Sequence, residues 1–363
     1  MPEPISPTEG SEGVSSRRQE ESVTPAIETA GLTKIFGGRR VVDSVDLSVP
    51  AGSVYAVLGT NGAGKTTTVR MLATLLRPDA GTARVFGRDV VSHPTAVRSV
   101  IGLTGQYASV DDDLTARENL ALFGRLVGAG RRRARSTADD LLAEFGLADA
   151  SDRRVREFSG GMRRRLDLAA SMITRPPLLF LDEPTTGLDP RTRTQMWQKV
   201  EELVAAGSTV LLTTQYLDEA DRLAARVAVM DAGRVVAEGT PDQLKSEVGE
   251  ASVHLDVVDQ DAIVRAAQVC AHFATGEVSV AHGRTVVVPM PDLTALPELL
   301  AAVRGADIAY SSVAVNRPTL DDVFFALTGP DARAAEVADP ESATPDAAVA
   351  GVAGRPTRSR SAA

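Results

Sequence analysis

The chain has 363 residues, a length typical of two or three domains, and 43% of them are hydrophobic, enough for a sizeable buried core. The formal charge of −9 favours neither nucleic acid nor anionic lipid as a partner of the whole chain, and 4% aromatic residues are too few for a surface that stacks bases. A single cysteine excludes a disulfide framework and a cysteine zinc site, and is typical of a reducing compartment.

The two ends of the chain differ from its centre in composition. Residues 1–24 are rich in Pro, Ser and Glu, and residues 330–363 in Ala, Pro and small polar residues, so we expect both tails to be disordered. The start, MPEPISPTEG, lacks the basic and then apolar stretch of a signal peptide. No run is apolar enough to span a membrane, so a membrane role is expected to come through a partner.

Residues 25–245 alternate short β-branched strands with helices. The segments 53–58 (SVYAVL), 178–182 (LLFLD) and 209–213 (TVLLT) are almost wholly apolar, which predicts strands buried on both faces of a parallel sheet. This alternation indicates a doubly wound α/β fold. Between about 107 and 175 the pattern is helical and polar, which predicts a helical insertion.

Residues 250–329 follow a different pattern. A strand (252–258), a helix (261–272), a hairpin (277–281 and 284–288), a helix (297–304) and a strand (308–315) precede a last helix at 319–327. The order βαββαβ plus a helix predicts a small α+β C-terminal domain of the ferredoxin-like kind.

Residues 59–66, GTNGAGKT, match G-x-x-x-x-G-K-[ST] between a strand and an apolar helix. The glycines let backbone N–H groups surround phosphate oxygens, and the helix adds its positive end. Lys65 brings a cation to the β- and γ-phosphates, and the Thr66 hydroxyl is a ligand for Mg²⁺. The predicted phosphate-binding residues are Gly59, Thr60, Asn61, Gly62, Ala63, Gly64, Lys65, Thr66 and Thr67.

Asp182 and Glu183 end the apolar strand LLFLD, where ligands bind in open α/β sheets. We expect Asp182 to hold Mg²⁺ through water and Glu183 to polarise the attacking water. The alternative is an ordinary acidic strand end, which two adjacent carboxylates downstream of a phosphate loop disfavour.

A second anion site is predicted at Ser159, Gly160 and Gly161, which precede a helix. A hydroxyl, bare N–H groups and a helix dipole together attract phosphate, although the same residues alone are typical of a helix N-cap. One nucleotide needs one phosphate cradle, so a second cradle indicates a second nucleotide.

These motifs, with Gln106 and GLD at 187–189, occur in the order and spacing of an ABC transporter nucleotide-binding domain, which residues 25–245 resemble. The resemblance implies a P-loop NTPase fold, ATP with Mg²⁺ as cofactors, and ATP hydrolysis. It also implies a twofold dimer in which residues 159–161 of one chain face the ATP bound by the other.

The same resemblance assigns further residues. It implies that Phe36 stacks on adenine, that Gln106 senses Mg²⁺ and the permease, and that Asp189 contacts the partner domain. Two positions depart from the common pattern: Met162 replaces the Gln of SGGQ, and Gln215 occupies the switch position that is normally His. With Gln215, the usual histidine-based account of catalysis does not apply directly.

The segments TGQY (104–107), FSGGMRRRLDLAASMI (158–173), LLTTQYLDEADRLA (211–224) and RPTLDDVFFALTG (317–329) resemble ATP-binding subunits of daunorubicin/doxorubicin-type drug-resistance exporters. This similarity implies export of drug-like or natural-product molecules through a separate permease, with the chain bound peripherally at the cytoplasmic face of the membrane. The alternatives are export of another lipid-like cargo, or a soluble ABC ATPase acting on ribosomes or DNA. A single phosphate loop and the lack of heptads disfavour the last.

Three basic clusters, at 131–135, 153–156 and 163–165, lie in or beside the helical insertion. They are interpreted as a solvated face with internal ion pairs or, alternatively, as a surface that meets the permease or the lipid headgroups beside it. No aromatic residues interleave the arginines, so nucleic acid is not expected as a partner.

Overall fold

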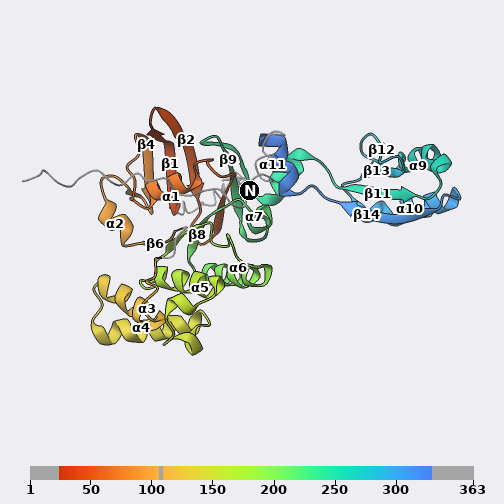
Figure 1. Ribbon diagram of the computed structural model, residues 1–363. Coiled ribbons are helices and arrows are strands. Elements are labelled where there is room, and N and C mark those ends of the chain that lie inside the picture. Colours follow the sequence, from red (N-terminus) through yellow and green to blue (C-terminus); the bar gives the residue numbers. More distant parts are fainter. Residues whose placement is uncertain (1–23, 106–108, 329–363) are drawn as a thin grey trace, which may run out of the picture.

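The computed structural model describes residues 24–105 and 109–328. The predicted tails therefore lie outside the described residues, apart from Thr24, and so does Gln106. Figure 1 shows a body with a sheet-rich upper part and a helical lower part, from which a separate C-terminal unit extends.

The centre of the body is a six-stranded sheet in the order β10-β9-β3-β8-β7-β6, parallel except for β10. Its strands β3, β7 and β8 are buried at every residue, as their unbroken apolar sequences predict. The strands are β3 (Val54–Leu58), β6 (Ile101–Thr104), β7 (Leu178–Asp182), β8 (Thr209–Thr214), β9 (Arg226–Asp231) and β10 (Arg234–Gly239).

A second sheet, antiparallel and in the order β2-β1-β4-β5, lies above the first; the alternating motif pattern did not indicate it. Its strands are β1 (Ile27–Phe36), β2 (Arg39–Val49), β4 (Ala80–Val85) and β5 (Arg88–Asp89). Apolar residues of β1, β2 and the central sheet form one core with helix α1 (Lys65–Leu72), which lies between the two sheets. The short helix α2 (Pro94–Arg98) leads into β6.

The other face of the central sheet is covered by the predicted helical insertion and by α6 (Pro190–Ala205). The insertion contains α3 (Ala116–Leu126), α4 (Arg131–Glu144) and α5 (Gly160–Ser171). Val54, Leu179 and Leu212 of the sheet pack in one core with these helices. Helix α3 begins with a capping box between Thr115 and Glu118.

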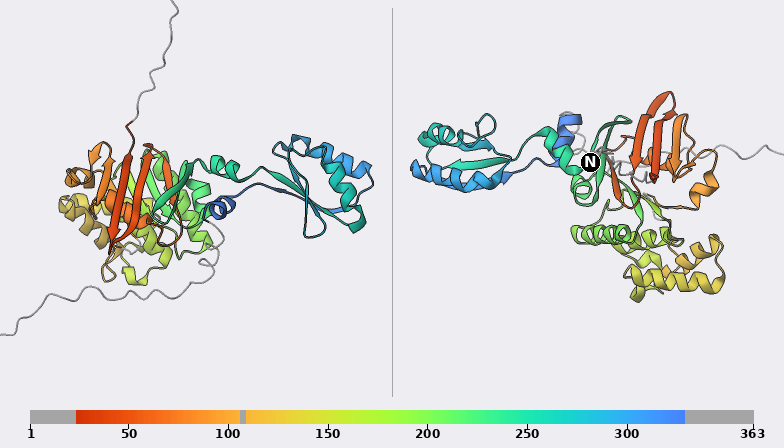
Figure 2. Two further views of the ribbon diagram at one scale, coloured as in Figure 1. Left: turned by 90° about the horizontal axis from the view of Figure 1, so that it is seen from above. Right: turned by 180° about the vertical axis from the view of Figure 1, so that it is seen from behind.

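The C-terminal unit is built around a four-stranded antiparallel sheet in the order β12-β13-β11-β14. Its elements follow the predicted βαββαβ order, with a hydrophobic core of its own. They are β11 (Ser252–Val257), α9 (Ile263–Cys270), β12 (Ser279–Ala281), β13 (Thr285–Pro289), α10 (Leu296–Gly305) and β14 (Tyr310–Asn316). Two extended segments join this unit to the body (Figure 2).

The last helix, α11 (Leu320–Thr328), returns to the body although the sequence pattern grouped it with the C-terminal unit. Leu320, Val323 and Phe324 pack with α7 (Leu217–Leu223), α8 (Pro241–Val248) and the outer faces of β3 and β9. Among the described helices, none is both long and apolar enough to cross a membrane.

Candidate nucleotide-binding and hydrolysis site

The phosphate loop joins the end of β3 to the start of α1, as predicted. Gly62 and Gly64 have φ values of +84° and +104°, a left-handed conformation that side chains rarely adopt. A Cβ atom on Gly59 would lie 2.4 Å from the carbonyl oxygen of Met230, and one on Gly64 would lie 2.7 Å from that of Val41. Positions 59 and 64 therefore require glycine, because the loop there lies directly against the backbone of Met230 and Val41.

Lys65 is the first residue of α1, and its side chain is only 4% exposed. Its Nζ donates to the carbonyl oxygens of Gly59 (2.7 Å) and Thr60 (3.1 Å) and lies 3.4 Å from Oε1 of Glu183. Burial lowers the pKa of the Lys65 ammonium, and the neighbouring carboxylate of Glu183 opposes this shift. The cation is thus held over the loop, beside the carboxylate that the sequence predicts as the polarising group.

Asp182 links the phosphate loop to the central sheet. Its Oδ1 accepts hydrogen bonds from the hydroxyls of Thr66 (3.1 Å) and Thr213. A hydroxyl from α1 and a carboxylate from β7 therefore meet at one point, which is the oxygen chemistry that Mg²⁺ prefers. In the described residues no three His, Cys, Asp or Glu side chains gather into a metal site.

Glu183 follows directly with φ +49°, a left-handed conformation for a residue that is not glycine. Its N–H donates to the carbonyl oxygen of Thr213 (3.0 Å), and its Oε2 accepts from the hydroxyl of Thr186 (3.4 Å). Such a backbone persists only where its surroundings hold it. The carboxylate is therefore aimed at Lys65 by a constrained backbone.

Gln215 comes directly after β8, the strand whose Thr213 bonds to Asp182. Tyr216 N–H donates to Thr214 Oγ1 (2.9 Å), and the Arg193 guanidinium lies 4.5 Å from the Tyr216 ring. The backbone around Gln215 is thus held, while its half-buried side-chain amide makes no hydrogen bond within the described part of the chain.

The second predicted anion site is exposed. Ser159 caps α5 by accepting from Met162 N–H (3.3 Å), and Gly161 lies so close to Thr192 that a Cβ atom would be 2.3 Å from its methyl group. Asp189 caps α6 by accepting from Thr192 N–H (3.0 Å), and its hydrogen bonds to Thr192 lower the pKa of its carboxyl. Among the described residues no hydrogen bond joins Ser159, Gly160 or Gly161 to the phosphate loop.

Phe36 ends β1 with 48% of its surface exposed. The ammonium of Lys34 lies 5.3 Å from its ring and is itself held by the carbonyl oxygen of Arg77 (2.8 Å) and by Asp79 (3.1 Å). An exposed ring with a fixed cation beside it is suited to stacking on a base.

Two interacting groups of α5 were not predicted from the sequence: Asp167, which is buried, and Arg164, whose side chain is 13% exposed and which lies in the run 163–165 that was interpreted as a basic surface cluster. Arg164 bonds to the backbone around Glu183. The available signal was Asp167: a carboxylate inside the apolar segment LDLAA requires a partner, and Arg164 is three residues before it on the helix.

Comparison with known proteins agrees with this geometry. Residues 42–186 match the sequence model of the family described as "ABC transporter". The daunorubicin/doxorubicin resistance ATP-binding protein DrrA of Streptomyces peucetius is 53% identical over 311 residues, 84% of this chain and 93% of that protein. The chain belongs to the ABC transporter family. It is therefore an ABC ATPase that binds nucleotide.

Other relatives of this ABC ATPase extend the likeness. The Nod factor export ATP-binding protein I of Paraburkholderia xenovorans (strain LB400) is 39% identical over 306 residues, 84% of this chain and 97% of that protein. The solved structure described as "Structure of ATP binding subunit of ABC transporter" is 28% identical, with a TM-score of 0.55, and covers 61% of this chain and 92% of its own.

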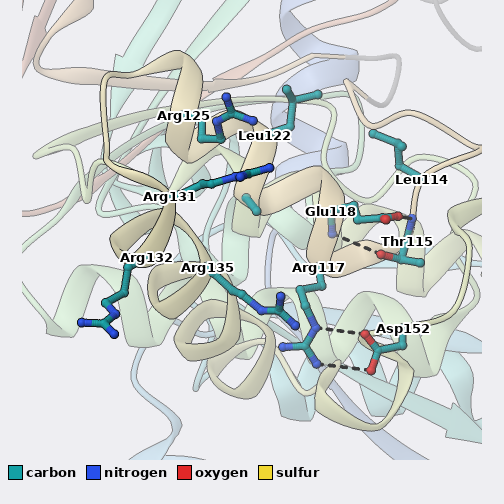
Figure 3. A pocket seen from close by; sticks show the side chains of 11 residues that line it. Leu114, Thr115, Arg117, Glu118, Leu122, Arg125, Arg131, Arg132, Arg135 and Asp152 are labelled. Atoms are coloured by element: carbon teal, nitrogen blue, oxygen red, sulfur yellow. Dashed lines mark hydrogen bonds and ion pairs between the residues drawn. The ribbon is translucent and has the colours of Figure 1, made fainter.

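The insertion of this ABC ATPase carries a groove of about 770 Å³ beside α3 and α4 (Figure 3). Arg117 in the groove pairs with Asp152 (3.0 Å). The side chains of four other arginines there form no hydrogen bond or ion pair with any described residue: Arg125, Arg131, Arg132 and Arg135. By contrast, Arg153, Arg156 and Arg163 of the other two clusters each pair with a carboxylate.

Proposed function

We propose that this chain is the ATP-hydrolysing subunit that powers export of drug-like or natural-product molecules through a separate membrane permease. The observation that carries the proposal is the 53% identity to a daunorubicin/doxorubicin resistance protein over most of both chains, combined with an assembled phosphate loop, Asp182 and Glu183. The Nod factor export relatives favour export of another cargo as the second candidate.

The site residues take these roles in the proposed reaction. Residues 59–67 hold the phosphates of ATP, Phe36 stacks on its adenine, and Lys65 moves from Glu183 toward the β- and γ-phosphates when these compete for its charge. Thr66 and Asp182, whose oxygens lie 3.1 Å apart, would hold Mg²⁺ together with Gln106, and the bound ion would neutralise charge on the phosphates. Glu183 polarises the attacking water, and Gln215 hydrogen-bonds the γ-phosphate or that water.

A second copy of the chain completes the site in this proposal. At the start of α5, Ser159 and Gly160 are exposed and Gly161 is half-buried. In the described part of the chain, the Ser159 hydroxyl bonds only to the N–H of Met162. These three residues contact the γ-phosphate bound by the partner copy, and Asp189, beside them at the start of α6, contacts the partner itself. Two ATP molecules are thereby enclosed between two chains.

The permease meets the groove of unpaired arginines on α3 and α4, and the chain lies at the cytoplasmic face of the membrane. Unpaired guanidinium groups around Leu114, Ala121 and Leu122 suit an acidic, amphipathic segment. We also propose two domains, 25–245 and 250–329, of which the second is an accessory α+β domain attached to the ATPase through α11.

Transport in cells tests the proposal. The test co-expresses the chain with a candidate multi-span permease, sought first in the neighbouring gene, in a drug-sensitive bacterium and measures efflux of an anthracycline. Efflux should require both proteins and should fail with Glu183→Gln, which retains ATP binding and accumulates an ATP-bound dimer. ATPase activity that ribosomes or DNA stimulate and the membrane protein does not would instead support the non-transport alternative.

A further inference from the structure

Arg164 of α5 has a fully engaged guanidinium group. Its Nε donates to the carbonyl oxygen of Pro184 (2.8 Å), and its Nη2 donates to those of Asp182 (3.0 Å) and Glu183 (3.1 Å). Its Nη1 donates to the carbonyl oxygen of Gly105 (2.7 Å) and lies 3.5 Å from Asp167 Oδ2. Arginine has five N–H donors, so each has one acceptor here.

Asp167, one turn further along α5, supports this arrangement. Its side chain is 1% exposed, and its Oδ1 accepts from the N–H of Ser109 (2.8 Å) while its other oxygen faces Arg164. Burial raises the pKa of the Asp167 carboxyl, whereas Ser109 and Arg164 oppose that shift. Gly105 and Ser109, the residues on either side of 106–108, are therefore both tied to α5 by this pair.

Arg164 contacts the backbone around Glu183, which has a left-handed conformation. Glu183 has φ +49°, and three consecutive carbonyl oxygens, from Asp182 to Pro184, accept from a single guanidinium group. The Glu183 N–H is held from the opposite side by Thr213. Removing Arg164 would leave these three carbonyl oxygens without this donor and would free the backbone to relax from its left-handed conformation.

We infer that Arg164 is a positioning residue for hydrolysis: it fixes the backbone that aims the Glu183 carboxylate and ties it to the helix that begins at Ser159. The inference rests on the proposed roles of Glu183 and of residues 159–161. Because the guanidinium of Arg164 bonds α5 to three consecutive carbonyl oxygens around Glu183, a displacement of α5 when Ser159 engages the partner's nucleotide moves the peptide of Glu183 with it. Lysine cannot replace this group, since its three donors radiate from one atom.

The experiment compares the full chain with Arg164→Lys, with Asp167→Asn and with Arg163→Lys. Arg163 is the matched control, because it is the neighbouring arginine on α5 and forms one ion pair, with Asp112, on a partly exposed side chain. Measured quantities are kcat at saturating Mg-ATP, the Kd of a fluorescent ATP analogue, and Tm. We expect Arg164→Lys to lower kcat by about 10- to 100-fold, as a misplaced reacting group does, with Kd changed by less than about threefold.

A double variant separates positioning from general damage to the fold. If Arg164 acts through Glu183, Arg164→Lys combined with Glu183→Gln should be no slower than Glu183→Gln alone. If Arg164→Lys does not fold, Asp167→Asn decides: it keeps the acceptor for Ser109 but loses its charge, so kcat should fall roughly 3- to 10-fold.

Three results would overturn the inference. They are wild-type kcat in folded Arg164→Lys, wild-type kcat in Asp167→Asn where Arg164→Lys does not fold, and an equal loss in Arg163→Lys. If Glu183→Gln loses turnover while Arg164→Lys keeps it, only the positioning role fails. If Glu183→Gln itself turns over ATP at the wild-type rate, the proposed hydrolysis role of Glu183 fails as well.

Discussion

Two helices of this ATPase begin with a glycine-containing segment that we propose as an anion site, and the two segments differ in burial and in charge. At the start of α1, Lys65 is 4% exposed and is surrounded by the loop carbonyls and by Glu183. At the start of α5, Ser159 and Gly160 are exposed, and the Ser159 hydroxyl has only the N–H of Met162 as its partner among the described residues. Under the proposed roles, one chain thus contains a buried phosphate site at the start of α1 and an open one at the start of α5.

The difference shows what each site can bind alone. The buried ammonium of Lys65 interacts more strongly with an anion than an exposed group does, because the effective dielectric constant around it is lower than that of water. An exposed helix start competes with water and salt, so its attraction for phosphate is weak until another surface covers it. The open site is therefore suited to act only when a second chain encloses the nucleotide.

The largest effect expected from this comparison is that Lys65→Ala and Ser159→Ala change different quantities: the first lowers ATP affinity, and the second lowers ATP-dependent dimerisation. Lys65→Ala should weaken ATP binding by more than about 100-fold, because two contacts to charged phosphates, worth about 1.5–3 kcal/mol each, are lost. Ser159→Ala should leave the ATP affinity of the isolated chain within about twofold but lower ATP-dependent dimerisation by at least roughly 10-fold. Equilibrium binding of a fluorescent ATP analogue and analytical ultracentrifugation measure the two quantities.

Ser159→Ala also removes a helix cap, so a control must remove one elsewhere. Thr240 caps α8 in the same way, by accepting from the N–H of Gln243 (3.1 Å). Thr240→Ala should cost a comparable ~0.5–2 kcal/mol of stability without changing dimerisation. If Ser159→Ala reduces ATP affinity as much as Lys65→Ala does, the two sites belong to one nucleotide within one chain, and the comparison is wrong.

A smaller effect is expected at Gln215, which lies beside the buried site with its amide free. A hydrogen bond to a charged group is worth about 1.5–3 kcal/mol, so Gln215→Ala should slow turnover by about 10- to 150-fold. Gln215→His should retain activity and add an acidic limb near pH 6.5 that the wild type lacks, since imidazole titrates there and an amide does not. Steady-state ATPase rates from pH 5.5 to 8.5 test both; a rate of Gln215→Ala within about twofold of wild type would mean that Gln215 is no switch.

Much of the buried site could be predicted from the sequence, because its signals are local. The glycines, Lys65 and Thr66 are contiguous, and the apolar strand that ends at Asp182 is short and unbroken. Their roles follow from backbone geometry that a few adjacent residues determine.

Three features were not predictable in this way, because they depend on contacts between distant segments. The antiparallel sheet of β1, β2, β4 and β5 pairs strands whose motifs carry no functional signal. Helix α11 packs on β3 and β9, which both precede α8 and the whole C-terminal unit in the sequence, so grouping α11 with its sequence neighbours placed it in the wrong unit. Arg164 belongs to a run of three arginines that periodicity alone does not separate; its hydrogen bonds to the backbone of residues 182–184 distinguish it from Arg163, which forms an ion pair with Asp112.

The smallest effect is expected at Met162, the position where most ABC proteins carry Gln. This residue is half-buried, and its side chain packs on the apolar core of the insertion. Met162→Gln should therefore change turnover by less than about twofold, while an amide placed against apolar groups costs roughly 1 kcal/mol and lowers Tm by about 2–4 °C. Met162→Leu, which preserves the packing, is the control and should leave both turnover and Tm near wild type. Calorimetry and ATPase assays at a temperature well below Tm separate the two effects. A severalfold gain in turnover for Met162→Gln at unchanged Tm would show that position 162 contributes to the open site after all, and that this site differs from the buried one less than its exposure indicates.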